Sequence, residues 1–526
     1  MKNDLITAQN LGFSSLDFLQ IKEHGISIES IQKQMDIFKA RISKSILVAP
    51  ASLSNGILKL SETDFQKKAA FYDDHKANLK LTKFVPASGA ASRMFKFLNE
   101  FLIGFDIEKE SINAYINRNK ESELTLFINR IDKFPFFEAV DKKLREVFPN
   151  YDFLEEDYKN YYFIKLLLES DSFDFANKPK GILPFHKYET HVGTAIEEHM
   201  RECASYSSSA TTSHLHFTVS EAHQSQFESI VSGLKTEVEK KSGTTLNISY
   251  SYQNKSTDTL AVDLDNNPFR NENGELVFRP GGHGALIENL NDLDADVVFI
   301  KNIDNVIQNN IAEIALYKKS LAGIALELQQ QVFGYLNAID SNEINEENIG
   351  EIIVFLKEKL NIEVSPEFDR FTFENKIVTI KEHIDRPIRV CSMVKNEGEP
   401  GGGPFWTKQE NGSVSLQIVE SSQVDLTDIN QVKILGSATH FNPVDLVCCI
   451  KNHKGRKFNL TQFIDHNSGF IVEKNVGKKN VKAYELPGLW NGAMANWLTV
   501  FVEVPLLTFN PVKTVNDLLK PAHQPK

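Results

Sequence analysis

The chain has 526 residues, 41% of them hydrophobic and 24% charged, which is enough for two to four compact lobes. Its 58 basic and 70 acidic residues give a net charge of −12 at pH 7, which disfavours broad nucleic-acid binding through a basic face. Four cysteines without CxxC spacing indicate a reducing compartment, and since no signal peptide or membrane-spanning run is recognisable, we expect a cytoplasmic protein without a membrane partner.

Helices are expected at the beginning of the chain. Residues 1 to about 78 are predicted to be helical, and residues 79–85 follow as a strand. Residues 100–176, rich in Phe, Tyr and Glu and poor in turn signals, are predicted to form a mostly helical insertion. Two long helical patterns at 306–339 and 343–361 precede a part that is rich in strands and turns.

Between the insertion and the long helices, strands and helices alternate. This order predicts an α/β fold with helices on both faces of a sheet. In such sheets, ligands bind at the carboxyl ends of the strands. The predicted elements are a helix around 190–202, a strand at 214–220, a helix after Ser220, a strand from 246, a short helix at 284–290 and a strand at 296–300.

A run of small residues follows the strand at 79–85, in the stretch "KFVPASGAASRMFK". Arg93 opens the helical pattern that comes next. Small residues let backbone N–H groups approach an anion, and a helix N-terminus adds its positive dipole end, so the stretch indicates a phosphate site. The alternative is a tight strand-to-helix turn. The small residues are Ser88, Gly89, Ala90, Ala91 and Ser92.

Three further stretches could carry chemistry. Lys180 lies in a stiff Pro-Lys-Gly loop, which could also be a plain turn. Asp304 follows a buried strand and could bind Mg²⁺ or simply form an Asx turn. Lys513, in "NPVKTVNDLLK", could be an ordinary solvated lysine. A phosphate-binding turn, two lysines and one metal-binding carboxylate together are the groups that an enzyme of phosphoryl or nucleotidyl transfer needs. Such catalysis depends on positioning the substrate and neutralising its charge.

Two other patterns leave alternatives open. His214 and His216 share one strand face with His223 nearby, which permits zinc binding, but hydrogen-bonded or substrate-facing histidines are preferred. The stretch "EGEPGGGPFW" at 397–406 could grip sugar hydroxyls or form a surface loop.

The ordered series of motifs resembles the nucleotide-diphospho-sugar transferase superfamily, especially the UDP-sugar pyrophosphorylases. "VPASGAASRM" is similar to their Gly-rich turn, "KPKGILP" to their Pro-Lys-Gly element and "PGGHGALIENL" to their Pro-Gly-His-Gly segment. "VVFIKNIDN" and "FNPVKTVNDLL" resemble two later elements. The whole chain also resembles an uncharacterised bacterial domain-of-unknown-function family assigned to that superfamily.

The resemblance implies a Rossmann-like mixed sheet of the GT-A type with helices on both faces. It implies a helical N-terminal segment at 1–78, a nucleotidyltransferase-like α/β domain at 79–430 with the helical insertion, and a C-terminal α+β part at 431–526. The implied reaction combines a sugar 1-phosphate with a nucleoside triphosphate such as UTP to give a nucleotide sugar and pyrophosphate.

The resemblance also implies a role for each matching residue. The backbone of Ser88–Ser92 would cradle the phosphates, Arg93 would contact the leaving pyrophosphate, and Asp304 would hold Mg²⁺. Lys180 and Lys513 would neutralise phosphate charge. The residues implied to contact the base, ribose or substrate are Gln253, Gly282 and His283.

The chain departs from the family pattern at the turn. The usual Gly-Gly-x-Gly-Thr is replaced by Ser-Gly-Ala-Ala-Ser, which adds side-chain atoms near the phosphates. A nucleotide-sugar sensor without turnover is therefore a second hypothesis. A glycosyltransferase is a third; it would need an Asp-x-Asp motif, for which only the "DLD" stretches at 263–265 and 292–294 are candidates.

Overall fold

The structure is a computed structural model that describes residues 2–40, 44–53, 55–398, 401–409, 411–477 and 479–526. The chain divides into two compact units, each built from segments that are distant in sequence. Unit 1 contains residues 1–80, 252–300 and 318–506, and unit 2 contains residues 81–251, 301–317 and 507–526. The three-part division expected from the sequence stays a prediction.

Unit 1 contains a mixed sheet with the strand order β2-β19-β12-β16-β11. β12 runs parallel to β19 and antiparallel to β16, and β19 runs parallel to β2. Smaller sheets have the orders β1-β13-β14 and β10-β9-β18-β17. The strands are β1 (Ile46–Pro50), β2 (Ile57–Leu58), β9 (Thr259–Val262), β10 (Phe278–Arg279), β11 (Val297–Lys301), β12 (Ile388–Lys395), β13 (Gly403–Lys408), β14 (Val414–Val419), β15 (His440–Phe441), β16 (Asp445–Cys449), β17 (Phe470–Val476), β18 (Lys479–Glu485) and β19 (Leu498–Glu503).

The N-terminal helices of unit 1 pack on the sheet that contains β9 and β18. Ile31, Met35 and Phe38 of α3 share an apolar cluster with Leu260 of β9 and Tyr484 of β18. Within its described residues, the predicted helical segment at 1–78 contains four helices, and the strands β1 and β2, which were not predicted, lie between the third and the fourth. The helices are α1 (Lys2–Asn10), α2 (Ser15–Glu23), α3 (Ile28–Ala40), α4 (Glu62–His75), α12 (Leu286–Asp292), α14 (Glu346–Leu360), α15 (Phe373–Ile384) and α16 (Ile429–Gly436); α13 (Ile311–Asp340) contributes residues to both units.

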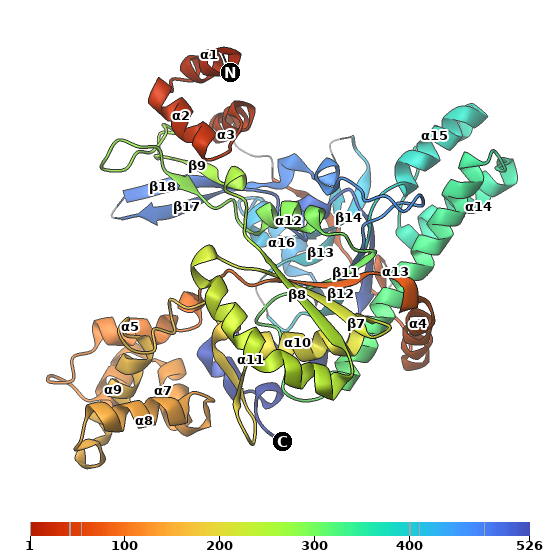
Figure 1. Cartoon of the computed structure of the whole chain (residues 1–526). Coiled ribbons are helices and arrows are strands. Elements are labelled where there is room, and N and C mark those ends of the chain that lie inside the picture. The colour runs from red at the N-terminus through yellow and green to blue at the C-terminus, as the bar shows by residue number, and fades with distance from the viewer. Residues whose placement is uncertain (1, 41–43, 54, 399–400, 410, 478) are drawn as a thin grey trace. The chain divides into compact units, whose positions relative to one another are not determined.

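Unit 2 has its own group of strands. β7 pairs in parallel with β3 and β8 and antiparallel with β6. Helices α10 and α11 pack against each other, and α10 contacts β7 while α11 contacts β8 (Figure 1). The elements are β3 (Leu81–Pro86), β4 (Pro184–Lys187), β5 (Val192–Thr194), β6 (Ser208–Ser209), β7 (Thr212–Thr218), β8 (Thr245–Ser251), α10 (Ala195–Tyr206) and α11 (Gln224–Ser242).

The helical insertion is confirmed and belongs to unit 2. Figure 1 shows α5, α7, α8 and α9 gathered together in orange. Buried Phe101, Phe127 and Phe163 of the insertion lie in the same apolar cluster as Val85 of β3 and Leu215 of β7, so the insertion shares the core of the sheet. Its helices are α5 (Lys96–Gly104), α6 (Ile112–Asn119), α7 (Ser122–Asn129), α8 (Phe137–Val147) and α9 (Glu156–Leu168).

Parallel and antiparallel pairs occur in both units, so the predicted α/β class with mixed sheets is confirmed.

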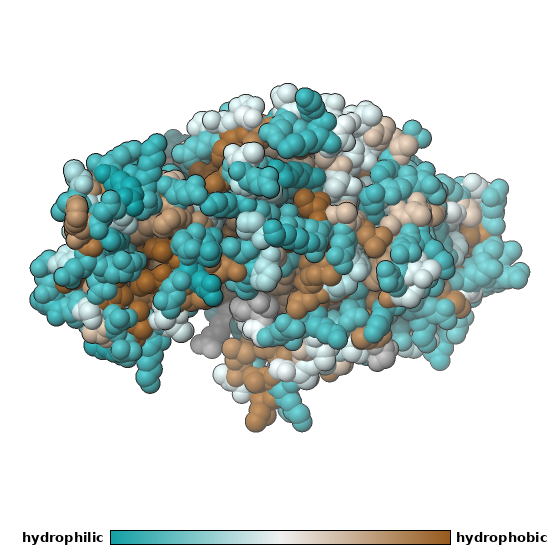
Figure 2. Space-filling model, turned by 90° about the horizontal axis from the view of Figure 1, so that it is seen from below, coloured by the Kyte–Doolittle hydropathy of each residue, from teal (hydrophilic) through white to brown (hydrophobic). Residues whose placement is uncertain are grey.

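Figure 2 shows hydrophilic side chains over much of one face, with apolar side chains among them. Among the described helices, none combines the length and apolarity of a membrane span. Cys203, Cys391, Cys448 and Cys449 are buried free thiols, as the sequence predicts.

Candidate functional site

The small-residue turn lies at the carboxyl end of β3. The amide of Ala87 donates to Thr218 O at the end of β7 (2.9 Å), and the three residues that follow, 88–90, are exposed. A short 3-10 turn at Ala91–Arg93 comes next, and α5 begins only at Lys96. The expectation that Arg93 opens an α-helix is therefore wrong by three residues, because Phe95 adopts φ −108° and ψ 17° between the two elements.

The turn is held by the Pro-Lys-Gly loop, although the helical insertion separates them in sequence. The amide of Ala91 donates to Lys178 O (2.9 Å), and Ala90 and Pro179 form an isolated antiparallel bridge. The amide of Lys180 also donates to Gly89 O (3.4 Å). These contacts close the base of the insertion, so that 86 intervening residues do not separate the two motifs in space.

Lys180 joins the loop to the segment after β11. Its Nζ donates to Asp304 Oδ2 (2.7 Å) and to Val512 O (2.7 Å). The side chains of Lys180 and Asp304 are 14% and 20% exposed, so the ion pair is largely buried but still accessible to a ligand from solvent. An ion pair in such a position is less screened by solvent than one on the open surface.

The C-terminal segment lies directly on the same groups. The amide of Val512 donates to Asp304 O (3.0 Å), and the amide of Val515 donates to Met94 O (2.9 Å), one residue after Arg93. Lys513 therefore lies between two anchored residues. Its Nζ lies 5.6 Å from the centre of the Phe509 ring.

All four motif segments thus meet within unit 2. These segments carry Arg93, Lys180, Lys513 and Asp304, and the Lys180 side chain contacts the Asp304 carboxylate directly. Arg93 is exposed and has no hydrogen bond or ion pair with any residue that the structure describes. A lysine paired with a carboxylate beside a turn of exposed backbone, with Arg93 and Lys513 on the adjoining segments, favours an anionic ligand such as a polyphosphate.

Asp304 fits the expected Mg²⁺ as a single-carboxylate ligand. Lys180 occupies Oδ2, while no described residue donates to Oδ1. Mg²⁺ retains several waters and typically takes one or two carboxylates together with phosphate oxygens. The described residues contain no cluster of three or more His, Cys, Asp or Glu side chains arranged to hold a metal, so phosphate and water would have to complete the coordination.

The other predicted contacts, Gln253, Gly282 and His283, belong to unit 1. Gly282 has φ +78°, a conformation that favours glycine. His283 stacks on Trp490 with ring centres 4.1 Å apart, and its Nδ1 accepts from the Leu489 amide (3.0 Å). The neutral ring therefore carries its hydrogen on Nε2.

Gln253 has a local partner in unit 1. Its Nε2 donates to Asp258 Oδ1 (3.5 Å), and the other oxygen of Asp258 pairs with His24 (2.9 Å). The roles predicted for Gln253, Gly282 and His283 remain predictions.

The histidine and Asp-x-Asp patterns have structural partners. His216 forms hydrogen bonds with Ser249 through Nδ1 and with Ser251 through Nε2, both at 2.8 Å. This agrees with the sequence-based preference for a hydrogen-bonded histidine over a zinc ligand. Asp263 accepts from the amides of its own turn, and Asp294 pairs with two lysines. In "EGEPGGGPFW", residues 399 and 400 lie outside the described part of the chain.

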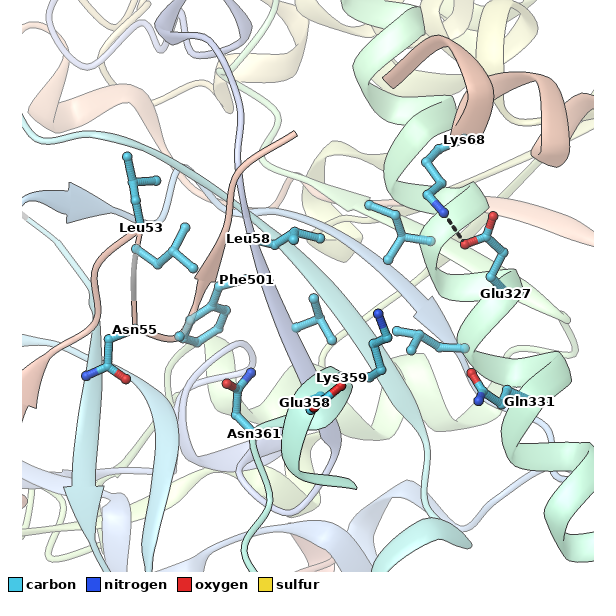
Figure 3. A pocket seen from close by; sticks show the side chains of 15 residues that line it. Leu53, Asn55, Leu58, Lys68, Glu327, Gln331, Glu358, Lys359, Asn361 and Phe501 are labelled. Carbon is cyan, nitrogen blue, oxygen red and sulfur yellow. Dashed lines mark hydrogen bonds and ion pairs between the residues drawn. The ribbon is translucent and has the colours of Figure 1, made fainter. Parts of the chain in front are cut away.

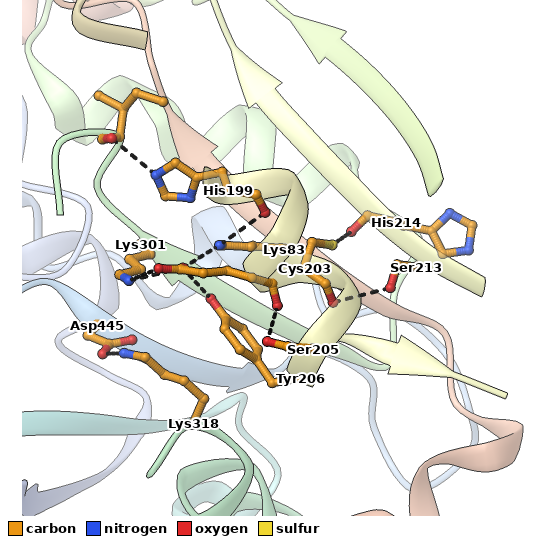
Figure 4. Close-up of polar contacts among 12 residues, drawn as sticks. Lys83, His199, Cys203, Ser205, Tyr206, Ser213, His214, Lys301, Lys318 and Asp445 are labelled. Atoms are coloured by element: carbon orange, nitrogen blue, oxygen red, sulfur yellow. Dashed lines mark hydrogen bonds and ion pairs between the residues drawn. The ribbon is translucent and has the colours of Figure 1, made fainter. Parts of the chain in front are cut away.

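A cluster of buried charges in unit 2 was missed from the sequence. Glu202 of α10 accepts from Lys83 of β3 and Lys301 at the end of β11 (Figure 4). All three side chains are at most 1% exposed. The available signal was a lysine within one apolar strand sequence, "LTKFVP", and another at the end of a second, "VVFIK".

Unit 1 also contains a cavity of about 330 Å³ that none of the predicted site residues lines. In Figure 3, the Lys68–Glu327 ion pair lies on one side of it and Phe501 on another.

These features define an α/β protein with a cationic site at the end of a strand. Residues 14–524 match the family described as "Domain of unknown function (DUF4301)", and the chain belongs to that family. No curated protein matches the sequence.

Solved structures with some similarity are UDP-sugar pyrophosphorylases. One is the uridine diphosphate N-acetylglucosamine pyrophosphorylase from Trypanosoma brucei in complex with an inhibitor (11% identity, TM-score 0.48, 96% of this chain and 79% of that one). Another is the H191L mutant of the UDP-glucose pyrophosphorylase from Leishmania major (11% identity, TM-score 0.40, 97% of this chain and 78% of that one). TM-scores below 0.5 are too low to carry a fold or an activity from these enzymes to this chain.

Proposed function

We propose that this protein is a Mg²⁺-dependent sugar-phosphate nucleotidyltransferase. The observation that carries the proposal is the contact of Lys180 with both Asp304 and Val512, which gathers the motif segments around one cationic site. The site's motifs are those that resemble UDP-sugar pyrophosphorylases.

The proposed reaction needs no covalent intermediate on the protein. An oxygen of the sugar 1-phosphate attacks the α-phosphorus of the nucleoside triphosphate, and the bond to the β-phosphate breaks to release pyrophosphate. The cations Arg93, Lys180 and Lys513 stabilise the negative charge that develops. When bound, Mg²⁺ would neutralise phosphate oxygens, with Asp304 as its protein ligand.

A binding screen tests the proposal first. Nucleoside triphosphates and nucleotide sugars, each with Mg²⁺, are added while the melting temperature is measured, because a ligand of the folded state raises it with concentration. We expect a uridine nucleotide to be among the stabilising compounds. Pyrophosphate release with sugar 1-phosphates then separates an enzyme from the alternative, a nucleotide-sugar sensor.

Substitutions assign the turnover to this site. Asp304→Asn preserves size and should abolish Mg²⁺-dependent turnover, whereas Arg93→Ala and Lys513→Met should each lower kcat by at least about tenfold, as expected when a charge-stabilising contact is lost. Lys187→Met is the control, because the side chain of this exposed lysine forms an ion pair with Glu138 and contacts none of the site residues that the structure describes. Wild-type rates in all three site variants would show that the chemistry lies elsewhere.

A further inference from the structure

Glu202 is the centre of a buried hydrogen-bond network in unit 2. It accepts from Lys83 Nζ (2.7 Å), from Lys301 Nζ (2.8 and 3.0 Å) and from the hydroxyl of Tyr206 (3.2 Å). Burial would raise the pKa of Glu202, but the charges of Lys301 and Lys83 outweigh it and hold that pKa well below its usual range. The network therefore contains a carboxylate and two ammonium groups that are removed from water.

His199 extends this network toward the candidate site. It lies one turn before Glu202 on α10, and its backbone carbonyl is 3.4 Å from Lys83 Nζ. Its Nε2 lies 3.1 Å from Ile303 O, and since a carbonyl can only accept, Nε2 carries the hydrogen. Nδ1 has no partner among the described residues. Burial, followed by the charge of Lys83, lowers the pKa of His199 well below its ordinary value, so the ring is neutral.

The carbonyl that His199 holds belongs to the peptide group between Ile303 and Asp304. Because a peptide group is planar, fixing its oxygen restricts the orientation of the next residue. On the other side of Asp304, the carbonyl of Asp304 itself accepts from the Val512 amide. The two hydrogen bonds hold the backbone of Asp304 on both sides.

We propose that His199 is a positioning residue, which directs the Asp304 carboxylate toward Lys180 through its hydrogen bond to Ile303 O. The buried Lys83–Glu202–Lys301 network holds His199 in place. A buried ion network is an inefficient source of stability, since the desolvation of its charges offsets most of their attraction. If the network instead holds His199 against the backbone that precedes Asp304, its position between α10 and that segment is explained. The effect of His199 on catalysis rests on the proposed function, whereas its effect on the position of Asp304 does not.

The test uses the chemical accessibility of Lys180, which needs no enzymatic activity. The full-length protein is treated with an amine-acylating reagent, and the labelling rates of individual lysines are measured by mass spectrometry. In His199→Leu, Lys180 should be labelled about tenfold faster than in the wild type, the scale of one lost hydrogen bond. Lys187, which is already exposed, should be labelled at the same rate in both proteins.

Two further variants separate positioning from stability. His199→Gln can place an amide donor near the Nε2 position and should restore slow labelling, whereas His199→Asn is too short and should not. Tyr206→Phe is the matched control, since it removes a buried hydrogen bond to Glu202 without touching Ile303. It should lower the melting temperature but leave the labelling of Lys180 unchanged.

The outcomes are decisive in both directions. Equal labelling of Lys180 in the wild type, His199→Gln and His199→Asn would overturn the positioning role, even if His199→Leu failed to fold. Where the wild type has turnover, His199→Asn should raise the Mg²⁺ concentration for half-maximal rate and leave the KM for sugar phosphate unchanged. A wild type without turnover would refute the proposed function alone, because labelling is measured independently.

Discussion

The ammonium group of Lys180 has three hydrogens, and two of them are donated to Asp304 Oδ2 and Val512 O. Lys180 therefore helps to hold the C-terminal segment and also neutralises the Asp304 carboxylate. In the proposed reaction, a substrate phosphate would share this cation, and Mg²⁺ would bind the Asp304 carboxylate. Arginine could not reproduce this arrangement, because the N–H groups of its planar guanidinium point in fixed directions.

At the residue scale, His216 should make stability sensitive to acid. Burial lowers its pKa to about 4, against an ordinary 6.5. Between these values the unfolded chain binds a proton that the folded chain does not, so stability falls as the pH is lowered from 6.5 to 4. At pH 5 the loss attributable to His216 should be about 2 kcal/mol relative to pH 7.

Urea unfolding of the wild type and His216→Gln at the two pH values measures this loss. The variant should lose less stability on acidification, because it has no proton to bind at this position. His466→Gln, which replaces an exposed ring, serves as the control. A variant as sensitive to pH as the wild type would contradict the assignment.

At the scale of elements, the short C-terminal segment depends on its capping residue. Asp517 Oδ2 accepts from the amides of Lys513 (2.8 Å) and Thr514 (2.7 Å) at the start of a 3-10 turn. Asp517→Ala removes both hydrogen bonds and should cost about 1–2 kcal/mol of stability. Because Lys513 then loses its fixed backbone, kcat should also fall.

Thermal unfolding and initial rates measure the two effects. Lys520→Met is the control, since it removes only the ion pair between Lys520 and Asp517, whose lysine is 58% exposed. If both substitutions changed stability and kcat equally, the hydrogen bonds from Asp517 to the Lys513 and Thr514 amides would not be what holds the segment.

Elements with a clear period could be predicted from the sequence. The alternating strand from 246 is β8, and the two long helical patterns are α13 and α14. β1 and β2 were missed because they are short and their sequences, "ILVAP" and "IL", contain no polar residue, so the sequence shows no alternation of polar and apolar side chains. The α-helix expected at Arg93 failed because small residues do not fix where a 3-10 turn ends and a helix begins.

At the scale of the whole molecule, the motifs of the site could be found, but most of their contacts could not. Lys180 is 124 residues from Asp304 and 332 from Val512, and no local pattern specifies such pairs. The partners of the buried lysines were equally hidden, because Glu202 lies on a helix whose sequence resembles any amphipathic one. Only the fold selects which charges meet.

The division into two units leads to a test of which predicted residues bind ligand together. Backbone hydrogen exchange is measured with and without a uridine nucleotide and Mg²⁺, since binding slows exchange where it stabilises local structure. We expect protection in unit 2 at 88–94, 178–182, 302–306 and 510–517, the segments around Lys180. The prediction for Gly282 and His283 requires protection at 281–284 in unit 1 as well. Protection confined to unit 2 would remove these two residues from the binding site, and protection that spared unit 2 would refute the site itself.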